Sequence, residues 1–171
     1  SDELQEAFED TEVTGIFCAR GGYGSSRIIQ KLNPEIISAN PKIFVGFSDI
    51  TLLLLWINKV SNLVVFHGPM IAGKLAEQLS SDDANMMKKI LFTDAPAGSI
   101  GKNKGTQTLQ DGTAQGALIG GSLSLLVSSI GTTCQPDTRG AILALEDVGE
   151  KPYRIDRMLQ QLKQVIQQFQ I

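Results

Sequence analysis

The sequence predicts an α/β fold: a partial parallel Rossmann-like sheet followed by a second, smaller β-rich domain. Three short apolar segments rich in β-forming residues, at 13–19, 41–45 and 63–66, support the parallel sheet. Helical patterns follow the first two, and all three end in small or polar residues. Strand, turn and helix in that order are typical of parallel α/β units. In such sheets the loops at the carboxyl ends of the strands form the ligand crevice.

The composition argues against several classes of protein. Hydrophobic residues make up 42% of the 171 residues and charged residues 19%, which is ordinary for a globular domain with a core. A formal charge of −3 argues against nucleic acid as the main partner. The apolar runs are far shorter than the roughly 20 residues that cross a bilayer. No export signal opens the sequence as given, so nothing in these residues directs export.

Two cysteines and one histidine limit the metal chemistry. Cys18 and Cys134 are far apart and follow no CxxC spacing, so we expect free thiols of an intracellular protein. His67 is the only histidine, which argues against a structural zinc site. These residues therefore predict no structural metal site.

The first predicted strand leads into a glycine-rich turn. Residues 4–8 fit the end of a short helix, and the strand at 13–19 stops at Arg20-Gly21-Gly22-Tyr23-Gly24, before a helix at 25–32. The turn lacks the spacing of a dinucleotide-binding motif or a P-loop. Its backbone amides fit an oxyanion or carboxylate site better. The alternative is a turn whose glycines satisfy only the backbone geometry.

The second predicted strand leads into a serine. It ends at Gly46-Phe47-Ser48-Asp49, and a helix is expected over about 50–60. At such a turn a serine hydroxyl projects into the crevice, and the next amide can stabilise an oxyanion. The match to G-x-S-x-G is partial, because Ile50 replaces the second glycine. The residues alone leave two interpretations open: a nucleophilic Ser48, or a helix cap formed by Ser48 or Asp49.

The third strand closes with His67-Gly68-Pro69-Met70, and further elements follow. In order, we expect helices at 70–79 and 83–92, a linker with short strands at 93–116, a strand running into a buried helix at 117–130, a strand at 141–146 and an amphipathic helix at 154–169. The chain is then divided into a partial N-terminal α/β domain (1–78), a linker helix (79–94) and a partial C-terminal β-rich domain (95–171).

Acidic residues close the strand at 141–146. Glu146, Asp147 and Glu150 are candidates for binding a metal, for orienting a histidine or for plain surface charge. Arg154 and Arg157 on the next helix are their candidate ion-pair partners. Spacing alone does not choose among these roles.

Four segments together resemble the LD-carboxypeptidase family, which includes the muramoyl-tetrapeptide carboxypeptidases and the microcin C immunity peptidases. They are IFCARGGYGSSRII (16–29), NPKIFVGFSDIT (40–51), FHGPM (66–70) and LEDVGEKPYRIDRML (145–159). Their order and spacing agree over most of the chain. The resemblance implies a serine hydrolase with a Ser–Glu–His triad and no cofactor.

The resemblance also implies roles for individual residues. Ser48 would be the nucleophile and Glu146 the carboxylate that orients the base. The oxyanion hole would consist of the amide of Asp49 and a glycine amide of Gly21-Gly22. The expected substrate-binding residues are Arg20, Tyr23 and His67. Arg20 would hold a substrate carboxylate, unless it pairs with a nearby acid.

The sequence departs from the family pattern in two places. The family's Gly-Gly-Asn-Leu segment is Gly120-Gly121-Ser122-Leu123 here. The family's catalytic histidine lies downstream in a Gly-His motif, and no such motif occurs before Ile171. The family's first strand and early loop are also missing, because Ser1 falls at what resembles an internal helix. We therefore expect a chain that is truncated at both ends and nearly inactive alone. His67 is expected in a packing or substrate-side role rather than as the base.

The implied reaction is hydrolysis of the L,D-peptide bond to the terminal D-amino acid of a murein tetrapeptide, in cytoplasmic cell-wall recycling. Two alternatives stay open: a hydrolase of peptide–nucleotide antibiotics of the microcin C type, and a non-catalytic binding module. Missing partner strands would leave an exposed edge or apolar patch, so we also expect a homodimer.

Overall fold

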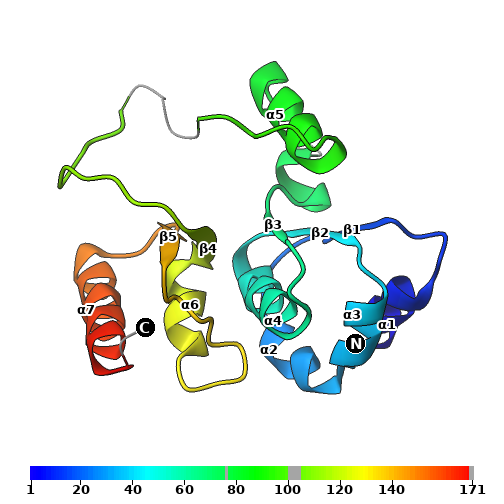
Figure 1. The fold of residues 1–171 in the computed structure, drawn as a ribbon, viewed down its shortest axis with the longest axis horizontal. Helices are drawn as coiled ribbons and strands as arrows, with labels where there is room; N and C mark the ends of the chain where they lie inside the picture. The colour runs from blue at the N-terminus through cyan, green and yellow to red at the C-terminus, as the bar shows by residue number, and fades with distance from the viewer. Residues whose placement is uncertain (76, 100–104, 170–171) are drawn as a thin grey trace.

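The computed structural model describes residues 1–75, 77–99 and 105–169. Its described residues form two neighbouring lobes, each with a small parallel sheet (Figure 1). We call residues 1–75 the N-terminal lobe and residues 117–169 the C-terminal lobe. Helix α5 (Ser81–Phe92) stands apart from both, on the opposite side of the N-terminal sheet from the other helices (Figure 1).

The N-terminal lobe is built on three parallel strands in the order β1-β2-β3. Val45 of β2 pairs with Phe17 of β1 on one side and with Phe66 of β3 on the other. Its elements are α1 (Asp2–Glu9), β1 (Gly15–Phe17), α2 (Ser25–Ile28), the 3₁₀ turn η1 (Ile29–Lys31), α3 (Pro34–Ala39), β2 (Ile43–Gly46), the 3₁₀ turn η2 (Ser48–Ile50), α4 (Thr51–Ser61), β3 (Phe66–His67) and the π-helical turn η3 (Ile71–Leu75).

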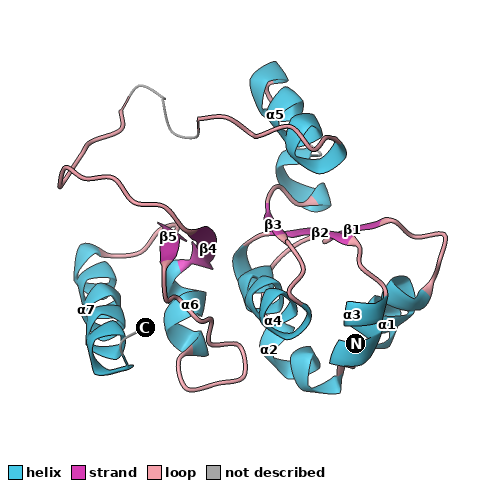
Figure 2. Cartoon of the chain, in the orientation of Figure 1, coloured by secondary structure: helices cyan, strands magenta, loops and turns pink. Residues whose placement is uncertain are grey.

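The C-terminal lobe pairs two strands and packs two helices beside them. Strands β4 (Ala117–Ser122) and β5 (Ala141–Glu146) are parallel and in register along their whole length. Helices α6 (Leu123–Ser129) and α7 (Pro152–Phe169) carry the apolar side chains that cover this core. The described part of 93–116 forms the long loop from α5 to β4 (Figure 2) and contains no strand, so the short strands expected there are not found.

Helix α4 holds the two lobes together because its first two turns are buried on every side. Its first seven residues are all buried. Most of its apolar side chains enter the N-terminal core, whereas Leu55 packs with Leu123, Leu126 and Leu162 of the C-terminal lobe. Thr51 adds a polar contact, since its Oγ1 accepts the backbone N–H of Ser122 at 3.2 Å. The start of α4 is therefore fixed to the end of β4.

These observations confirm the α/β class and the parallel sheet. The free state of both cysteines is also confirmed. No group of three or more potential metal ligands occurs in the described ranges. None of the helices described is long and apolar enough to cross a bilayer. The division at 78 and 95 stays a prediction, and α5 falls within its middle segment.

Candidate active site

Ser48 occupies the turn between β2 and α4 in a strained backbone conformation. Its φ is 61°, in the left-handed region that residues other than glycine rarely adopt. A Cβ on Gly46 would lie 2.8 Å from Cβ of Ile50, so this tight turn requires a glycine two residues before the serine. Strain of this kind is found at strand-to-helix turns that present a nucleophile.

The competing interpretation, a helix cap, does not describe this turn. The residue at the N-cap position of α4 is Ile50, which makes no side-chain cap. The Asp49 carboxylate is buried and accepts the backbone N–H of Ser25 at 2.9 Å. Ser25 is the first residue of α2, where a negative charge is favourable. Asp49 thus ties the serine turn to the glycine-rich turn that precedes α2.

The glycine-rich turn approaches the serine at Gly21. A Cβ on Gly21 would lie 2.9 Å from Cβ and 3.1 Å from Oγ of Ser48. The expected meeting of the two turns is therefore found, and it is close enough to require glycine at position 21. Gly22, with φ of 115°, has open space where a Cβ would be.

The carboxyl ends of β3 and β5 bring a histidine to a carboxylate. His67 Nε2 lies 3.8 Å from Glu146 Oε1, and the two side chains are 31% and 33% exposed. Burial lowers the pKa of His67. Burial, and to a lesser degree the Asp147 charge, raises the pKa of Glu146. At neutral pH we therefore expect a neutral imidazole beside a carboxylate.

The other two acids of this segment have structural partners. Asp147 accepts the backbone N–H groups of Ser124 in α6 and of Val148. Glu150 pairs with Arg154 at 3.0 Å, one of the ion pairs expected from the sequence. Glu146 is thus the acid of the three that faces the junction between the lobes.

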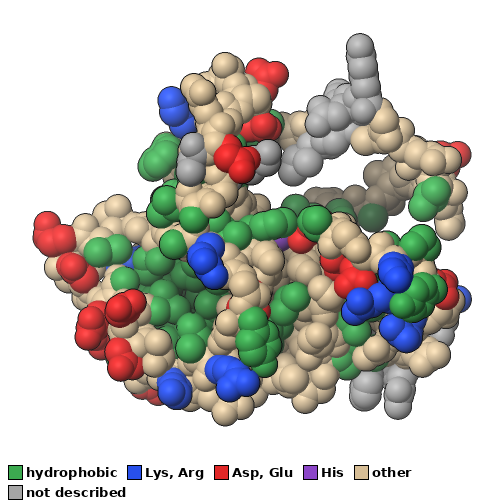
Figure 3. Space-filling view, turned by 180° about the vertical axis from the view of Figure 1, so that it is seen from behind, with side chains coloured by type: hydrophobic (Ala, Val, Ile, Leu, Met, Phe, Trp, Pro, Cys, Tyr) green, Lys and Arg blue, Asp and Glu red, His purple; other side chains and the backbone are tan. Residues whose placement is uncertain are grey.

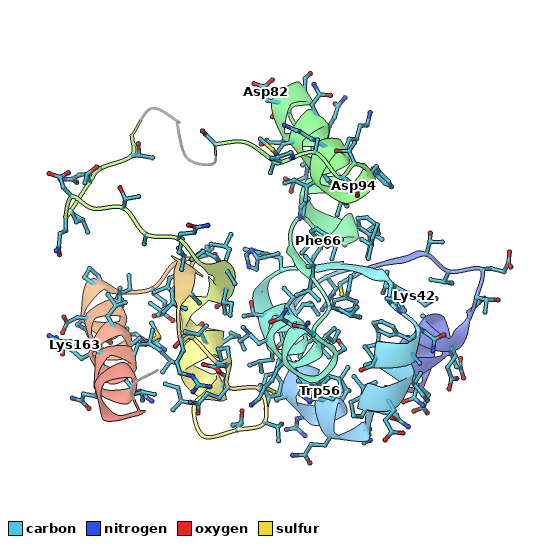
Figure 4. The ribbon with its side chains drawn as sticks, viewed as in Figure 1. Lys42, Trp56, Phe66, Asp82, Asp94 and Lys163 are labelled. Atoms are coloured by element: carbon cyan, nitrogen blue, oxygen red, sulfur yellow. The ribbon has the colours of Figure 1, made fainter. Side chains whose placement is uncertain are left out.

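Gly121 makes the close approach of the lobes feasible. Its φ is 132°, and a Cβ there would lie 2.7 Å from Thr51 Cγ2 and 3.3 Å from His67 Cδ2. Phe66, the other residue of β3, lies below α5 in the view of Figure 4. Sequence reasoning missed Thr51 and Gly121 as parts of the site; the Gly120-Gly121 pair ahead of an apolar helix was the available signal.

The two remaining predicted site residues lie on the open side of the glycine-rich turn. Arg20 is exposed, and in the described part of the chain it forms no ion pair. Tyr23 is 78% exposed, with the Arg27 guanidinium 5.4 Å from its ring centroid. Both side chains are therefore accessible to a ligand. The structure brings together Gly21, Ser48 and Asp49 in one group, and His67 with Glu146 in another.

Two family models match most of this chain. Residues 1–68 match the LD-carboxypeptidase N-terminal domain, and residues 115–168 match the LD-carboxypeptidase C-terminal domain. A probable murein peptide carboxypeptidase of Bacillus subtilis is 42% identical over 165 residues, which cover 94% of this chain and 50% of that protein. The chain spans about half the length of the curated relatives it matches.

Two groups of solved structures share the fold. A muramoyltetrapeptide carboxypeptidase from Oxalobacter formigenes superimposes with a TM-score of 0.80 at 31% identity, over 96% of this chain and 55% of that one. The microcin C7 self immunity protein MccF, in complex with aspartyl sulfamoyl adenosine, superimposes with a TM-score of 0.81 at 27% identity, over 96% and 57%.

Proposed function

The chain belongs to the LD-carboxypeptidase family, and from this premise we propose that it carries the nucleophile and the orienting carboxylate of a serine peptidase. The substrate would be a murein-derived tetrapeptide, from which the enzyme removes the terminal D-amino acid. The main observation in favour is Ser48, held at φ 61° in a strand-to-helix turn that closely approaches Gly21.

In this reaction the Ser48 Oγ attacks the carbonyl carbon of the L,D-peptide bond while its proton passes to a general base. The backbone N–H groups of Asp49 and of Gly21 or Gly22 stabilise the oxyanion. Collapse of the tetrahedral intermediate breaks the C–N bond, and the D-amino acid leaves with the proton that the base returns. Water then hydrolyses the acyl-enzyme and restores Ser48.

Glu146 is proposed to orient and stabilise the protonated base, as the carboxylate of a catalytic triad does. Its neighbours Asp147 and Glu150 are occupied by α6 and Arg154, which supports this choice. The family resemblance implies a histidine base. His67 belongs to the separate FHGPM segment rather than to the family's Gly-His motif. Because the chain spans about half the length of its relatives, we propose that the base lies on a part of the enzyme outside these 171 residues.

Arg20 and Tyr23 are proposed to bind the substrate from the open side of the glycine-rich turn. A guanidinium matches a carboxylate with two parallel hydrogen bonds, and the leaving D-amino acid carries a terminal carboxylate. Exposure of both side chains supports this role. Loss of Arg20 should raise KM more than it lowers kcat.

A covalent serine probe tests the nucleophile directly. An active fluorophosphonate should label the full gene product at one serine, and peptide mass mapping should locate the adduct at Ser48. Ser48→Ala should abolish labelling, whereas Ser61→Ala, a change of the serine that ends α4, should leave it intact. Labelling at a different serine would refute the assignment.

The likeness to MccF favours a second candidate, cleavage of a peptide–nucleotide conjugate of the microcin C type. The two reactions would share Ser48 and differ in both the acyl group and the leaving group. Competition between aspartyl sulfamoyl adenosine and a murein tetrapeptide distinguishes them through the ratio of the two kcat/KM values. A third reading, a non-catalytic binding module, predicts binding without turnover of either compound.

We also propose a cellular setting and an oligomeric state. We infer a cytoplasmic role in cell-wall recycling from the murein peptides that similar proteins are named for. We also propose a homodimer, because Leu118 and Ile142 pair across β4 and β5 while 63% and 39% exposed. Hydrophobic side chains also gather on the face of the N-terminal lobe seen in Figure 3. Sedimentation velocity on wild type and Leu118→Lys tests the dimer.

A further inference from the structure

His67 and Glu146 form a side-chain contact between the two sheets. His67 closes β3 of the N-terminal lobe, and Glu146 closes β5 of the C-terminal lobe. Their facing atoms, Nε2 and Oε1, are 3.8 Å apart. The triad role proposed for Glu146 requires its carboxylate to keep one orientation. A contact from the opposite lobe can provide that constraint.

The imidazole itself is held from two directions. Its ring centroid lies 5.0 Å from that of Phe47 in an edge-on arrangement, and Phe47 directly precedes Ser48. On the other side, a Cβ on Gly121 would lie 3.3 Å from His67 Cδ2. The ring therefore sits between the nucleophile turn and β4, and its backbone pairs in register with Gly46.

The chemistry of the pair is that of a donor and an acceptor. A neutral imidazole has one N–H, and the Nε2–H tautomer would direct it to the Glu146 carboxylate. Asp147 is the other charged group beside Glu146, and its two oxygens are bound by backbone N–H groups. At 3.8 Å the contact is longer than a hydrogen bond. Contacts within active sites often tighten only when substrate is bound.

We propose that His67 is a positioning residue that acts through Glu146: its Nε2–H directs the carboxylate toward the catalytic base. This inference rests on the proposed function of Glu146. It differs from the substrate-side role expected for His67 from the sequence. It also explains why Gly121 leaves room for an imidazole at the lobe junction.

A double-mutant cycle in the full gene product tests the proposal, with D-amino acid release as the readout. His67→Leu should lower kcat by about tenfold or more with little change in KM, as loss of an orienting partner does. His67→Gln keeps an N–H donor at similar reach and should recover most of the lost kcat. Val64→Thr, a change of an exposed residue in the segment just before β3, is the control and should match wild type.

The cycle separates positioning from plain structural support. In a Glu146→Gln background, His67→Leu should have no further effect on kcat, because the group it acts through is already lost. If His67→Leu lowers kcat by the same factor in the Glu146→Gln background as in wild type, the proposal is overturned. Equal loss in His67→Leu and His67→Gln would also overturn it.

An NMR measurement keeps the test independent of activity. His67 is the only histidine of the chain, so its ring ¹⁵N signals need no assignment by mutation. The 171-residue chain should show the Nε2–H tautomer, and Glu146→Gln should lower the pKa of His67, because a nearby negative charge is removed. The Nδ1–H tautomer, or an unchanged pKa, would overturn the pairing. Failure of the proposed function would instead appear as no D-amino acid release by wild type while this NMR result holds.

Discussion

A Cβ added to Gly21 would lie 2.9 Å from Cβ of Ser48, a separation that real Cβ atoms essentially never show. The two residues come from different strand ends, and Asp49 holds their turns together through the N–H of Ser25. The position of the serine hydroxyl therefore depends on glycine at position 21.

Gly21→Ala is expected to lower kcat/KM by at least about a hundredfold, because a small displacement of a nucleophile is costly. The fold should persist, because Gly21 is only half-buried and lies outside both hydrophobic cores. Steady-state kinetics and circular dichroism measure the two effects. Gly112→Ala, where nothing lies within 4 Å of the added Cβ, is the matched control and should behave as wild type.

Thr51→Val tests the polar link between the lobes. The side chain of Thr51 is fully buried and accepts the N–H of Ser122. Valine has the same shape, so the main effect is an unsatisfied buried N–H, which costs about 1–3 kcal/mol of unfolding free energy. Urea denaturation measures the difference, and Thr113→Val at an exposed loop position is the control. Equal midpoints for Thr51→Val and wild type would contradict the link.

Substitution of Asp147 should lower stability, whereas substitution of its neighbour Glu146 should lower activity. Asp147→Ala removes an acceptor at the start of α6 and should cost about 0.5–2 kcal/mol of stability. Glu146→Gln should leave stability nearly unchanged and remove most of the activity. Thermal unfolding and D-amino acid release, measured on both variants, check the contrast. Full activity in Glu146→Gln would show that Glu146 does not orient the catalytic base.

The thiol of Cys18 should ionise only at a pH above that of an ordinary cysteine. Burial raises its pKa from 9.0 to about 11, so at pH 9 the folded chain holds far less thiolate than the unfolded chain. Iodoacetamide should therefore modify Cys18 much more slowly in buffer than in urea. Between pH 9 and about 11 the unfolded state loses this proton first, so stability should fall as pH rises through that window. Cys18→Ala should reduce that fall.

Much of the fold was predictable because its signals are local. The strand at 141–146 was predicted with the bounds of β5, and the strand running into a helix at 117–130 is β4 followed by α6. The third strand lies later than predicted, at Phe66–His67, because α4 ends in a left-handed Asn62 and the chain first has to reach the sheet edge. Of the helix expected at 70–79, the described residues form only the short π-helical turn Ile71–Leu75, with Gly73 in a non-helical conformation, and residue 76 lies outside the described residues.

The site was predictable only in part. Gly21, Ser48 and Glu146 stand at strand ends, and position along a strand can be read from the sequence. Which of three neighbouring acids faces the crevice depends on the partners of Asp147 and Glu150, which spacing does not reveal. The contact of Gly121 with Thr51 joins residues 70 positions apart, so only the packing of the lobes shows it.

The most direct measurement is release of D-alanine from a murein tetrapeptide. It should compare the 171-residue chain, the full product of the gene, and that product with Ser48→Ala. Release by the full product alone, lost in Ser48→Ala, is the result the account predicts. Undiminished release by Ser48→Ala would contradict the assignment of the nucleophile, and no release by the full product would contradict the assigned substrate.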